Sequence, residues 1–291
     1  MDVVLIFNGL GNQMSQYALY LNKKNNGQNV RYICIGTAHN GIELGRLFGI
    51  DVKMRLLDKI LILLYHIIST DKFPAFFKPL QSLFSLLGIV VVREAGEYAY
   101  KQEVADQGRY RIRFLAGGWH HGDYFSSIEN IVRDTYTFPR IIDKSNLELL
   151  NSISNCSSVA IHIRRGDYMA PRYYKQFGSV CTDQYYINAM NLIEKEVDSP
   201  IYYIFSNDKE YSLNLFKDKK YVFVDCNSGI DSWKDLILMS RCNYLVMSNS
   251  TFSWWAAWLK NMPSHIFRPP FFVNGDMNSN IYKDNWITIN N

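Results

Sequence analysis

Two adjacent arginines, a glycine and an aspartate form the most chemically informative stretch of this 291-residue chain. Arg164, Arg165 and Asp167 directly follow the apolar run 159–163, within the sequence VAIHIRRGDY. Neighbouring guanidinium groups repel each other, so a doublet at the end of a strand favours a bound anion. The alternative is a surface ion pair between one arginine and Asp167. Because ligands of open α/β sheets bind at the carboxyl ends of the strands, we predict an anion site here.

Two further groups of polar residues follow apolar runs in the second half of the chain. Ser250 and Thr251 open a helical segment after the run 243–249, and a helix N-terminus offers N–H groups and hydroxyls to a phosphate. They can also simply cap the helix, and both functions can hold at once. Asn207 and Asp208 follow the run 200–206, and Asp208 is placed to accept hydrogen bonds from a purine or ribose. Three such strand ends on one sheet edge predict a site for a nucleoside diphosphate.

A glycine turn near the start of the chain has the sequence FNGLGNQ. It resembles part of a dinucleotide fingerprint, but Met14 replaces the third glycine and no acidic residue follows at the ribose-binding spacing. We therefore reject NAD binding. Gly11, Asn12 and Gln13 still offer backbone and side-chain amides to an anion or a sugar. A purely structural turn is equally consistent with the sequence.

Composition and motifs limit the other classes of ligand. The net charge is +4, no run of five basic residues occurs, and nucleic acid is therefore not expected as a partner. The chain contains no DxD motif, no P-loop and no CxxC pair among its five cysteines, and the pair His120–His121 lacks helical metal-ligand spacing. We expect no metal and no cofactor. The cysteine pattern favours a reducing compartment.

Strand-like and helix-like segments alternate along most of the chain. Continuous apolar strands alternating with helices predict parallel sheets covered on both faces, in two α/β units that face a cleft. We place the domain boundary within residues 140–155, which gives domains of 1–150 and 151–291. Residues 40–135 are irregular and receive no detailed assignment. The expected strands cover 3–7, 30–35, 158–164, 200–206, 221–225 and 243–249.

Two apolar segments, 60–68 and 83–92, are too short to span a membrane. We favour core positions for both. Basic residues precede the first segment and lie between the two, so a peripheral contact with an anionic membrane is the alternative. The sequence shows no signal peptide. The sequence thus predicts a cytoplasmic protein. Peripheral attachment to the inner membrane is the alternative.

Three segments, GLGNQMSQYA, HIRRGDY and SNSTFSWWAAWL, resemble the bacterial α-1,2-fucosyltransferases of glycosyltransferase family 11. The resemblance covers about residues 5–270. FSND and GGWHHGDYF (117–125) are similar to two further elements of the family. Asn207 stands where an acid is more usual, and His120 and His121 depart from the usual pattern.

The resemblance implies a GT-B fold with two Rossmann-like domains facing a cleft. GDP-fucose would bind the C-terminal domain 151–291, and a galactose-terminated glycan, lipid-linked or free, would bind the N-terminal domain 1–150. The implied reaction is inverting transfer of L-fucose to the 2-hydroxyl of the galactoside, without a divalent metal. Another fucosyl linkage on the same scaffold and a non-catalytic GDP-sugar-binding protein are the alternatives.

The resemblance also assigns roles to residues. Arg165, with Arg164, would stabilise the charge that develops on the departing diphosphate. Asp167 would act as the base or would orient an arginine. Asn12, Gln13 and Gly11 would contact the fucose or the acceptor. The donor-binding set is completed by His162, Asn207, Asp208, Ser250, Thr251 and Phe252.

Overall fold

The computed structural model describes residues 1–36, 39–94, 98–260, 265–275 and 281–291. The chain forms two compact units, Met1–Pro139 and Arg140–Asn291. The sequence interpretation divided the chain after residue 150, and the structure divides it earlier, because helix α7 (Lys144–Ser154) packs on α11 (Trp233–Arg241) of the second unit. The Asp143 carboxylate caps α7 and also pairs with Lys234 Nζ at 3.0 Å. Both contacts fix α7 to unit 2.

Unit 1 contains a four-stranded parallel sheet in the order β2-β1-β4-β3. The central strand β1 is apolar and buried along its whole length, as expected of a parallel sheet covered on both faces. The chain moves from β1 outward to β2, and then returns to the other side of β1. The sheet thus has a topological switch point between β1 and β4. Its strands are β1 (Asp2–Ile6), β2 (Val30–Cys34), β3 (Ile89–Arg93) and β4 (Ile112–Ala116).

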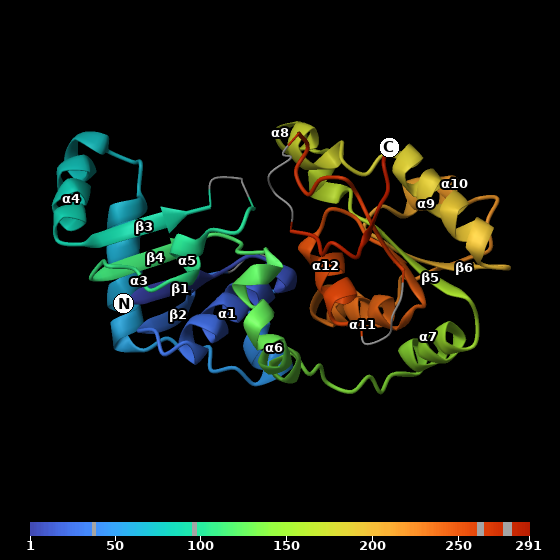
Figure 1. Ribbon diagram of the computed structural model, residues 1–291, viewed down its shortest axis with the longest axis horizontal. Helices are drawn as coiled ribbons and strands as arrows, with labels where there is room; N and C mark the ends of the chain where they lie inside the picture. The colour runs from blue at the N-terminus through green and yellow to red at the C-terminus, as the bar shows by residue number, and fades with distance from the viewer. Residues whose placement is uncertain (37–38, 95–97, 261–264, 276–280) are drawn as a thin grey trace. The chain divides into compact units, whose positions relative to one another are not determined.

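Helices cover both faces of this sheet (Figure 1). Helix α3 (Leu56–Ser69) packs Leu61 and its neighbours against Val3, Leu5 and Phe114. Helix α1 lies over β1, with α5 and α6 beside it. The sequence interpretation left this half largely unassigned. The elements are α1 (Leu10–Asn25), α2 (Leu44–Phe48), α4 (Pro74–Leu86), α5 (Gln102–Ala105) and α6 (Glu129–Thr135).

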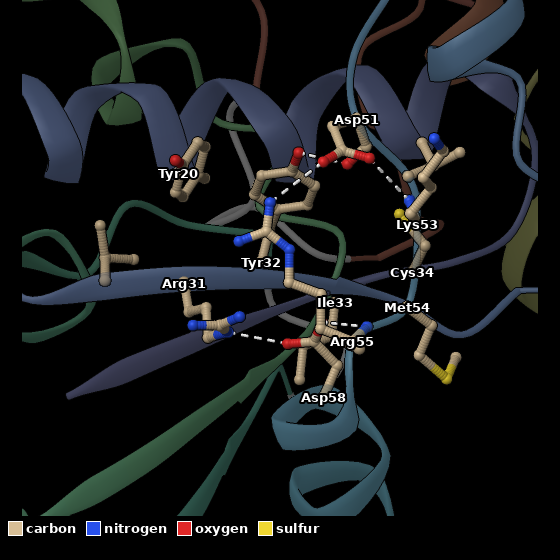
Figure 2. A pocket seen from close by; sticks show the side chains of 12 residues that line it. Tyr20, Arg31, Tyr32, Ile33, Cys34, Asp51, Lys53, Met54, Arg55 and Asp58 are labelled. Carbon is tan, nitrogen blue, oxygen red and sulfur yellow. Dashed lines mark hydrogen bonds and ion pairs between the residues drawn. The ribbon is translucent and has the colours of Figure 1, made fainter.

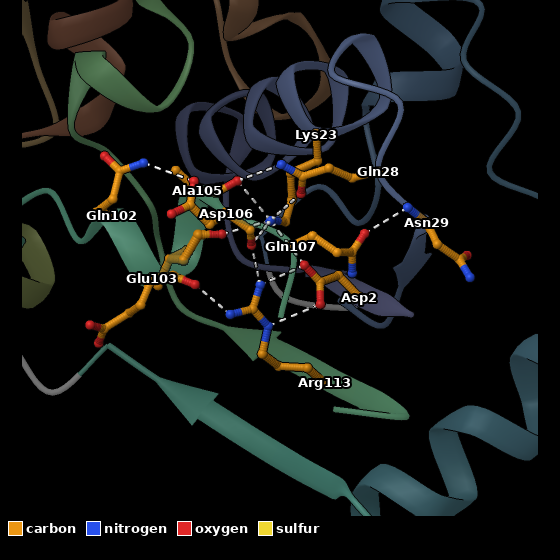
Figure 3. Close-up of polar contacts among 11 residues, drawn as sticks. Asp2, Lys23, Gln28, Asn29, Gln102, Glu103, Ala105, Asp106, Gln107 and Arg113 are labelled. Carbon is orange, nitrogen blue, oxygen red and sulfur yellow. Dashed lines mark hydrogen bonds and ion pairs between the residues drawn. The ribbon is translucent and has the colours of Figure 1, made fainter. Parts of the chain in front are cut away.

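A buried charged cluster fixes the amino end of the unit 1 sheet (Figure 3). Asp2 accepts hydrogen bonds from Arg113 Nε at 2.9 Å and Nη2 at 2.6 Å, and its Oδ2 lies 2.9 Å from Lys23 Nζ. Lys23 also donates to the carbonyls of Val104, Ala105 and Asp106 at 2.7–3.1 Å. The cluster therefore joins β1, α1 and β4 to the segment around α5.

Unit 2 contains a six-stranded parallel sheet in the order β10-β9-β8-β5-β6-β7. From β5 the chain proceeds outward through β6 and β7, and then through β8, β9 and β10 on the other side. This is the strand order of a doubly wound Rossmann sheet, with its switch point between β5 and β8. The strands are β5 (Ser158–Ile163), β6 (Ile201–Ser206), β7 (Tyr221–Phe223), β8 (Tyr244–Val246), β9 (Ile266–Arg268) and β10 (Ile287–Thr288).

Helices again cover both faces of the unit 2 sheet (Figure 1). Helix α9 (Asp183–Glu196) buries Tyr185, Met190 and Ile193 against β5 and β6. Thr182 caps this helix, since its Oγ1 accepts from Tyr185 N at 3.4 Å. Helices α11 and α12 (Thr251–Trp258) pack on each other, and α10 (Lys209–Leu215) follows β6. Both units thus confirm the prediction of parallel α/β sheets.

The expected core position of the segments 60–68 and 83–92 is wrong for part of each. Ile60, Leu63, Leu83 and Leu86 are exposed on α3 and α4. Only one side of α3 faces the sheet, and the apolar residues on its other side find no covering element among the described residues. Across those same residues, no helix combines the length and the apolar character that crossing a membrane requires.

Candidate functional site

The switch point of unit 2 gathers the polar groups that the sequence singled out. Arg164 and Arg165 directly follow β5, Asn207 directly follows β6, and Ser248 lies just beyond β8. These three parallel strands are neighbours, and their carboxyl ends share one edge. In doubly wound sheets this edge is where nucleotides bind. The structure therefore brings together the three strand ends from which the site was predicted.

Arg165 is held in place from the β6 side. Its Nε donates to Asp208 Oδ2 at 2.9 Å, its backbone N–H donates to Asn207 Oδ1 at 2.8 Å, and its guanidinium lies 3.7 Å from the ring centre of Tyr211. Within the described part of the chain, neither Nη group of Arg165 has a hydrogen-bond partner. The protein thus fixes the guanidinium through Nε and leaves the two donors of its outer edge for a ligand.

Gly166 allows this arrangement. Its φ is +28°, and a Cβ at this position would lie 2.3 Å from Asn207 Nδ2. A side chain here would displace the amide that binds the Arg165 backbone. The glycine of the RRGD sequence therefore serves the positioning of Arg165.

Arg164 and Asp167 form the ion pair that was the alternative interpretation of this motif. Arg164 Nη2 lies 2.7 Å from Asp167 Oδ1, and the guanidinium lies 5.5 Å from the Tyr168 ring centre. Asp167 remains half-exposed. The pair involves only one edge of Arg164, so it is compatible with anion binding. It also places Asp167 in the position of a residue that orients an arginine.

The N-terminus of α12 supplies the second half of the site. Ser250 is the N-cap, and its Oγ accepts from Phe252 N at 3.3 Å. The Phe252 N–H, predicted to contact the donor, is therefore already used by the cap. No hydrogen bond of the described residues involves Thr251 N or its hydroxyl. Thr251 is thus the residue through which the end of α12 would bind a phosphate.

His162, predicted to bind the donor, is buried in β5 beside the segment that follows β8. Its Nδ1 lies 2.8 Å from Ser248 Oγ, and its ring centre is 5.9 Å from that of Phe252. Burial, with a smaller effect of Arg164, lowers the pKa of His162 to about 3, so the ring is neutral. Its hydrogen bond to Ser248 joins β5 to the segment that follows β8, which gives His162 a positioning function.

Several residues that the sequence interpretation missed complete the site. Tyr211 lies against Arg165, and Tyr168 donates its hydroxyl to the carbonyl of Asn249 at 3.3 Å. Asn249 is buried, and its Nδ2 binds the carbonyls of Phe177 and Phe272 at 3.1 and 3.0 Å. Asp208 also has a second function, because it caps α10 by accepting from Tyr211 N at 3.1 Å. The spacing of Asp208 and Tyr211 was the available signal, since it is that of an N-cap and the third residue of a helix.

The glycine turn of unit 1 lies at that unit's own switch point. Asn12 is partly exposed in the first turn of α1, near Gly11. Gln13 is buried, its Nε2 donates to the carbonyls of Asn8 and Gly41, and its Oε1 accepts from Glu43 N at 2.9 Å. These three bonds make Gln13 a structural residue of the turn, so the predicted ligand contact is left to Asn12 and the backbone.

A second group of buried residues follows β3 and β4 of unit 1. One oxygen of Glu94 accepts from Gly118 N at 2.7 Å and Trp119 N at 3.3 Å. Burial raises the pKa of Glu94 to about 7. Trp119 has a left-handed backbone with φ of +54°, and His120 is buried with its ring stacked on Tyr98 at 5.5 Å. The GGWHH sequence therefore forms a tightly packed turn, in which His120 has a structural function.

A pocket of about 340 Å³ lies at the edge strand β2 of unit 1 (Figure 2). Two ion pairs form within its lining: Arg31 Nε lies 2.7 Å from Asp58 Oδ1, and Arg55 Nη2 lies 3.3 Å from Asp51 Oδ2. The Tyr32 hydroxyl donates to the carbonyl of Asp51 at 2.6 Å. Because these partners lie within the pocket itself, we do not assign it to the anion. The described residues also include no cluster of three His, Cys, Asp or Glu side chains able to hold a metal ion.

The comparison with protein families agrees with this geometry. The model of glycosyl transferase family 11 matches residues 101–290. This chain belongs to glycosyl transferase family 11. Its two Rossmann-like α/β units are the two domains expected of a GT-B type enzyme.

Relatives of this family 11 chain include proteins from bacteria and primates. An α-1,2-colitosyltransferase of Escherichia coli is 29% identical over 95% of this chain and 94% of its own length. A galactoside α-(1,2)-fucosyltransferase 1 of Ateles belzebuth is 31% identical, but the match covers 35% of this chain and 28% of that protein. Among solved structures, the NodZ α-1,6-fucosyltransferase soaked with GDP-fucose is similar at 10% identity, with a TM-score of 0.46 over 89% of this chain and 91% of that one.

Proposed function

We propose that this protein transfers L-fucose from GDP-fucose to the 2-hydroxyl of a terminal galactoside with inversion at the anomeric carbon. Membership of family 11 and the relatives named α-1,2-transferases support the reaction class. The observation that carries the proposal is Arg165. Asp208 binds its guanidinium through Nε, Asn207 binds its backbone N–H, and its Nη donors have no partner within the described chain.

The chemistry of the donor explains the need for such a group. Cleavage of the bond between the fucose C1 and the phosphate oxygen leaves positive charge on the sugar and negative charge on the departing GDP. Donors that are already fixed in place stabilise this charge without reorganising during the reaction. We assign this role to the Nη groups of Arg165, with Arg164 and the N-terminus of α12 at Thr251 as its partners. Asp208 and Asn207 position Arg165, and contact of Asp208 with a purine or ribose stays a prediction.

Positive charge from these residues would also replace a divalent cation. Arg164 and Arg165 are permanently charged, and the α12 N-terminus adds a partial positive charge. We therefore propose that transfer requires no metal. The acceptor hydroxyl must lose its proton as it attacks the fucose C1 from the face opposite the leaving group. Because Asp167 is paired with Arg164 at 2.7 Å, we propose that it orients this arginine.

A second donor follows from the E. coli relative, which is named an α-1,2-colitosyltransferase and matches nearly the whole chain. Colitose is L-fucose without its 3-hydroxyl group. The diphosphate site described here would serve both GDP-sugars equally. The choice between them depends on contacts to the sugar ring, which this site does not include.

The test is a transfer assay with the purified protein and both donors. GDP-fucose or GDP-colitose is incubated with lactose, N-acetyllactosamine and a galactosyl-β-1,3-N-acetylhexosamine, and the linkage of the product is determined by NMR. We expect an α-1,2-linked product with at least one acceptor, and the ratio of kcat/KM values identifies the donor. Tight GDP binding without transfer or donor hydrolysis would favour the non-catalytic alternative. A linkage to another hydroxyl would favour a different fucosyl linkage on the same scaffold.

A further inference from the structure

Unit 1 exposes an unusual concentration of large apolar side chains on α3, α4 and the residues next to them. Nine of the fifteen exposed large hydrophobic residues of the described chain lie between residues 54 and 87. Leu56 is 75% exposed, Phe73 76% and Leu86 87%. We call this set the apolar surface. It consists of Met54, Leu56, Leu57, Ile60, Leu63, Phe73, Leu83, Leu86 and Leu87.

Helix α3 is apolar on two opposite sides. The side formed by Leu61, Tyr65 and Ile68 packs in the core of unit 1. At about 3.6 residues per turn, Leu56, Ile60 and Leu63 form a separate stripe on the far side of the helix. A surface helix in a globular protein normally presents polar residues there. More than half of the surface of each of these three side chains is left uncovered by the described residues, so the second stripe indicates an external partner.

Helix α4 extends the same property. Leu83, Leu86 and Leu87 are spaced three and four residues apart, and all are exposed. Helices α3 and α4 pack against each other beside β3 (Figure 1). Phe73 is the N-cap residue that precedes α4, and it is also exposed. The apolar surface thus spans two adjacent helices and their connection.

The exposed charges within this segment are mainly positive. Residues 53–88 contain five basic side chains, namely Lys53, Arg55, Lys59, Lys72 and Lys78, and two acidic ones, Asp58 and Asp71. Asp58 is buried and paired with Arg31 at 2.7 Å. Helix α4 contains no acidic residue. Lys59 lies next to Leu56 and Leu63 on α3, one turn from each.

We propose that the apolar surface and its basic residues bind the surface of an anionic phospholipid membrane. Apolar side chains that enter the acyl boundary, with lysines and arginines at the level of the headgroups, are the composition of an interfacial helix. At 14 and 13 residues, α3 and α4 are too short to span a bilayer, so they lie along it. This deepens the proposed function by bringing the enzyme to lipid-linked acceptors, although the contact itself requires no catalysis.

The test measures binding of the full chain to vesicles in the absence of donor and acceptor. Phosphatidylcholine vesicles are compared with vesicles in which roughly one lipid in three is phosphatidylglycerol, by sedimentation or flotation. We expect binding to the anionic vesicles, weaker binding to the neutral ones, and release at high salt, because the Debye length shrinks from about 10 Å at 0.1 M to about 3 Å at 1 M.

Two double variants separate the apolar and the electrostatic contributions. Ile60→Glu with Leu63→Glu places charges on the apolar stripe, and Lys59→Glu with Lys78→Glu reverses two basic residues. We expect each to lower the vesicle partition coefficient at least tenfold. The matched control is Ile142→Glu in unit 2, where the isoleucine is 80% exposed but lies outside the apolar surface. The control should bind vesicles like the unchanged protein.

Every variant is also assayed for GDP binding and for transfer to a soluble acceptor, which report on the fold and on the proposed reaction. Loss of vesicle binding with these activities intact would support the proposal. Absence of binding to anionic vesicles, or equal binding by the Ile60/Leu63 variant, would overturn it. A dimer in light scattering that this variant dissociates, without vesicle binding, would assign the surface to a second copy of the chain. Failure of transfer with vesicle binding preserved would refute the proposed function alone.

Discussion

Unit 1 brings two cations and one carboxylate together at the end of its sheet, and unit 2 brings two cations and two carboxylates together, but the hydrogen bonding of the two clusters differs. In unit 1, Asp2, Lys23 and Arg113 are buried at the amino end of the strands, and carbonyl groups complete their hydrogen bonding. In unit 2, Arg164 and Arg165 lie at the carboxyl end, partly exposed, and each is paired through a single nitrogen. The first cluster is satisfied by the protein itself, whereas the second retains donors.

This difference distinguishes structural charge from functional charge. A buried ion pair requires excellent geometry and additional hydrogen bonds to offset the cost of removing both charges from water. Lys23 donates to three carbonyls and Gln28 Oε1, so its donors are saturated. The Arg165 guanidinium lies against the ring of Tyr211 and forms a hydrogen bond to the described chain on one edge only. If this division holds, loss of a partner in the buried cluster lowers the stability of the fold, whereas loss of a donor at Arg165 lowers the rate of transfer.

The first prediction concerns Asp2→Asn in the buried cluster. The substitution leaves Lys23 and Arg113 buried without their anion, which we expect to lower the free energy of unfolding by about 3–5 kcal/mol. Denaturant unfolding measures the change. Asp51→Asn is the matched control, because Asp51 pairs with Arg55 at the surface, and its loss should alter stability little. Equal effects of the two substitutions would show that burial does not distinguish the clusters.

The second prediction concerns Arg165→Lys. Lysine retains the charge but not the planar pair of donors. Removal of one preorganised donor costs on the order of 10²–10³ in kcat, while the free energy of unfolding should hardly change. The measurement combines kcat for transfer, the Kd of GDP and denaturant unfolding, with Arg241→Lys as the control at an exposed position of the same unit. A nearly unchanged kcat would mean that a single positive charge is sufficient to stabilise the departing diphosphate.

The sequence alone indicated Arg165 because the strand, the arginine doublet and the glycine follow each other directly along the chain. It also indicated the strands of unit 2, whose apolar runs are continuous. It did not indicate the cluster at Asp2, since its members are brought together from 111 residues apart by the sheet. It did not indicate the burial of His162 and Gln13, because burial of a polar side chain depends on tertiary contacts. The exposed side of α3 was assigned to the core for the same reason.

Asp2 is paired with two cations, whereas the largely buried carboxylate of Glu94 accepts from two backbone N–H groups, and Glu94 therefore offers a third prediction. Its pKa is raised to about 7 from 4.5, chiefly by burial. The folded protein therefore holds this proton more tightly than the unfolded chain does, and stability falls as the pH rises from 4.5 to 7. The loss amounts to about 3 kcal/mol at pH 7 and above.

Glu94→Gln should remove this pH dependence, since an amide oxygen can still accept from the N–H groups of Gly118 and Trp119. Denaturant unfolding between pH 4.5 and pH 8 compares the two proteins. The variant should equal the unchanged protein at the acidic end and exceed it at the alkaline end. If the free energies of unfolding of the two proteins change in parallel with pH, ionisation of Glu94 costs the folded state no stability. Glu94 would then not differ from Asp2 in the way proposed.

A fourth, smaller effect is expected for Asp167→Asn, which removes the partner of Arg164 at 2.7 Å. A partly exposed ion pair contributes about 0.2–1 kcal/mol, so the Kd of GDP should rise no more than about fivefold. Transfer should fall in the same proportion if Asp167 only orients the arginine. Calorimetry and steady-state kinetics measure the two quantities. Abolished transfer with an unchanged Kd would identify Asp167 as the base.

The smallest effect is expected from removal of divalent metal. If the outer donors of Arg165, the charge of Arg164 and the end of α12 stabilise the departing diphosphate, excess EDTA should leave kcat unchanged. The measurement is the initial rate of transfer before and after chelation, with a metal-dependent glycosyltransferase treated in parallel as the control. Loss of activity that Mn²⁺ or Mg²⁺ restores would show that the arginines are insufficient. The free donors at the carboxyl edge of unit 2 would then bind a diphosphate that also carries a metal ion. They would still differ from the cluster at Asp2, where the protein itself satisfies the hydrogen-bond donors.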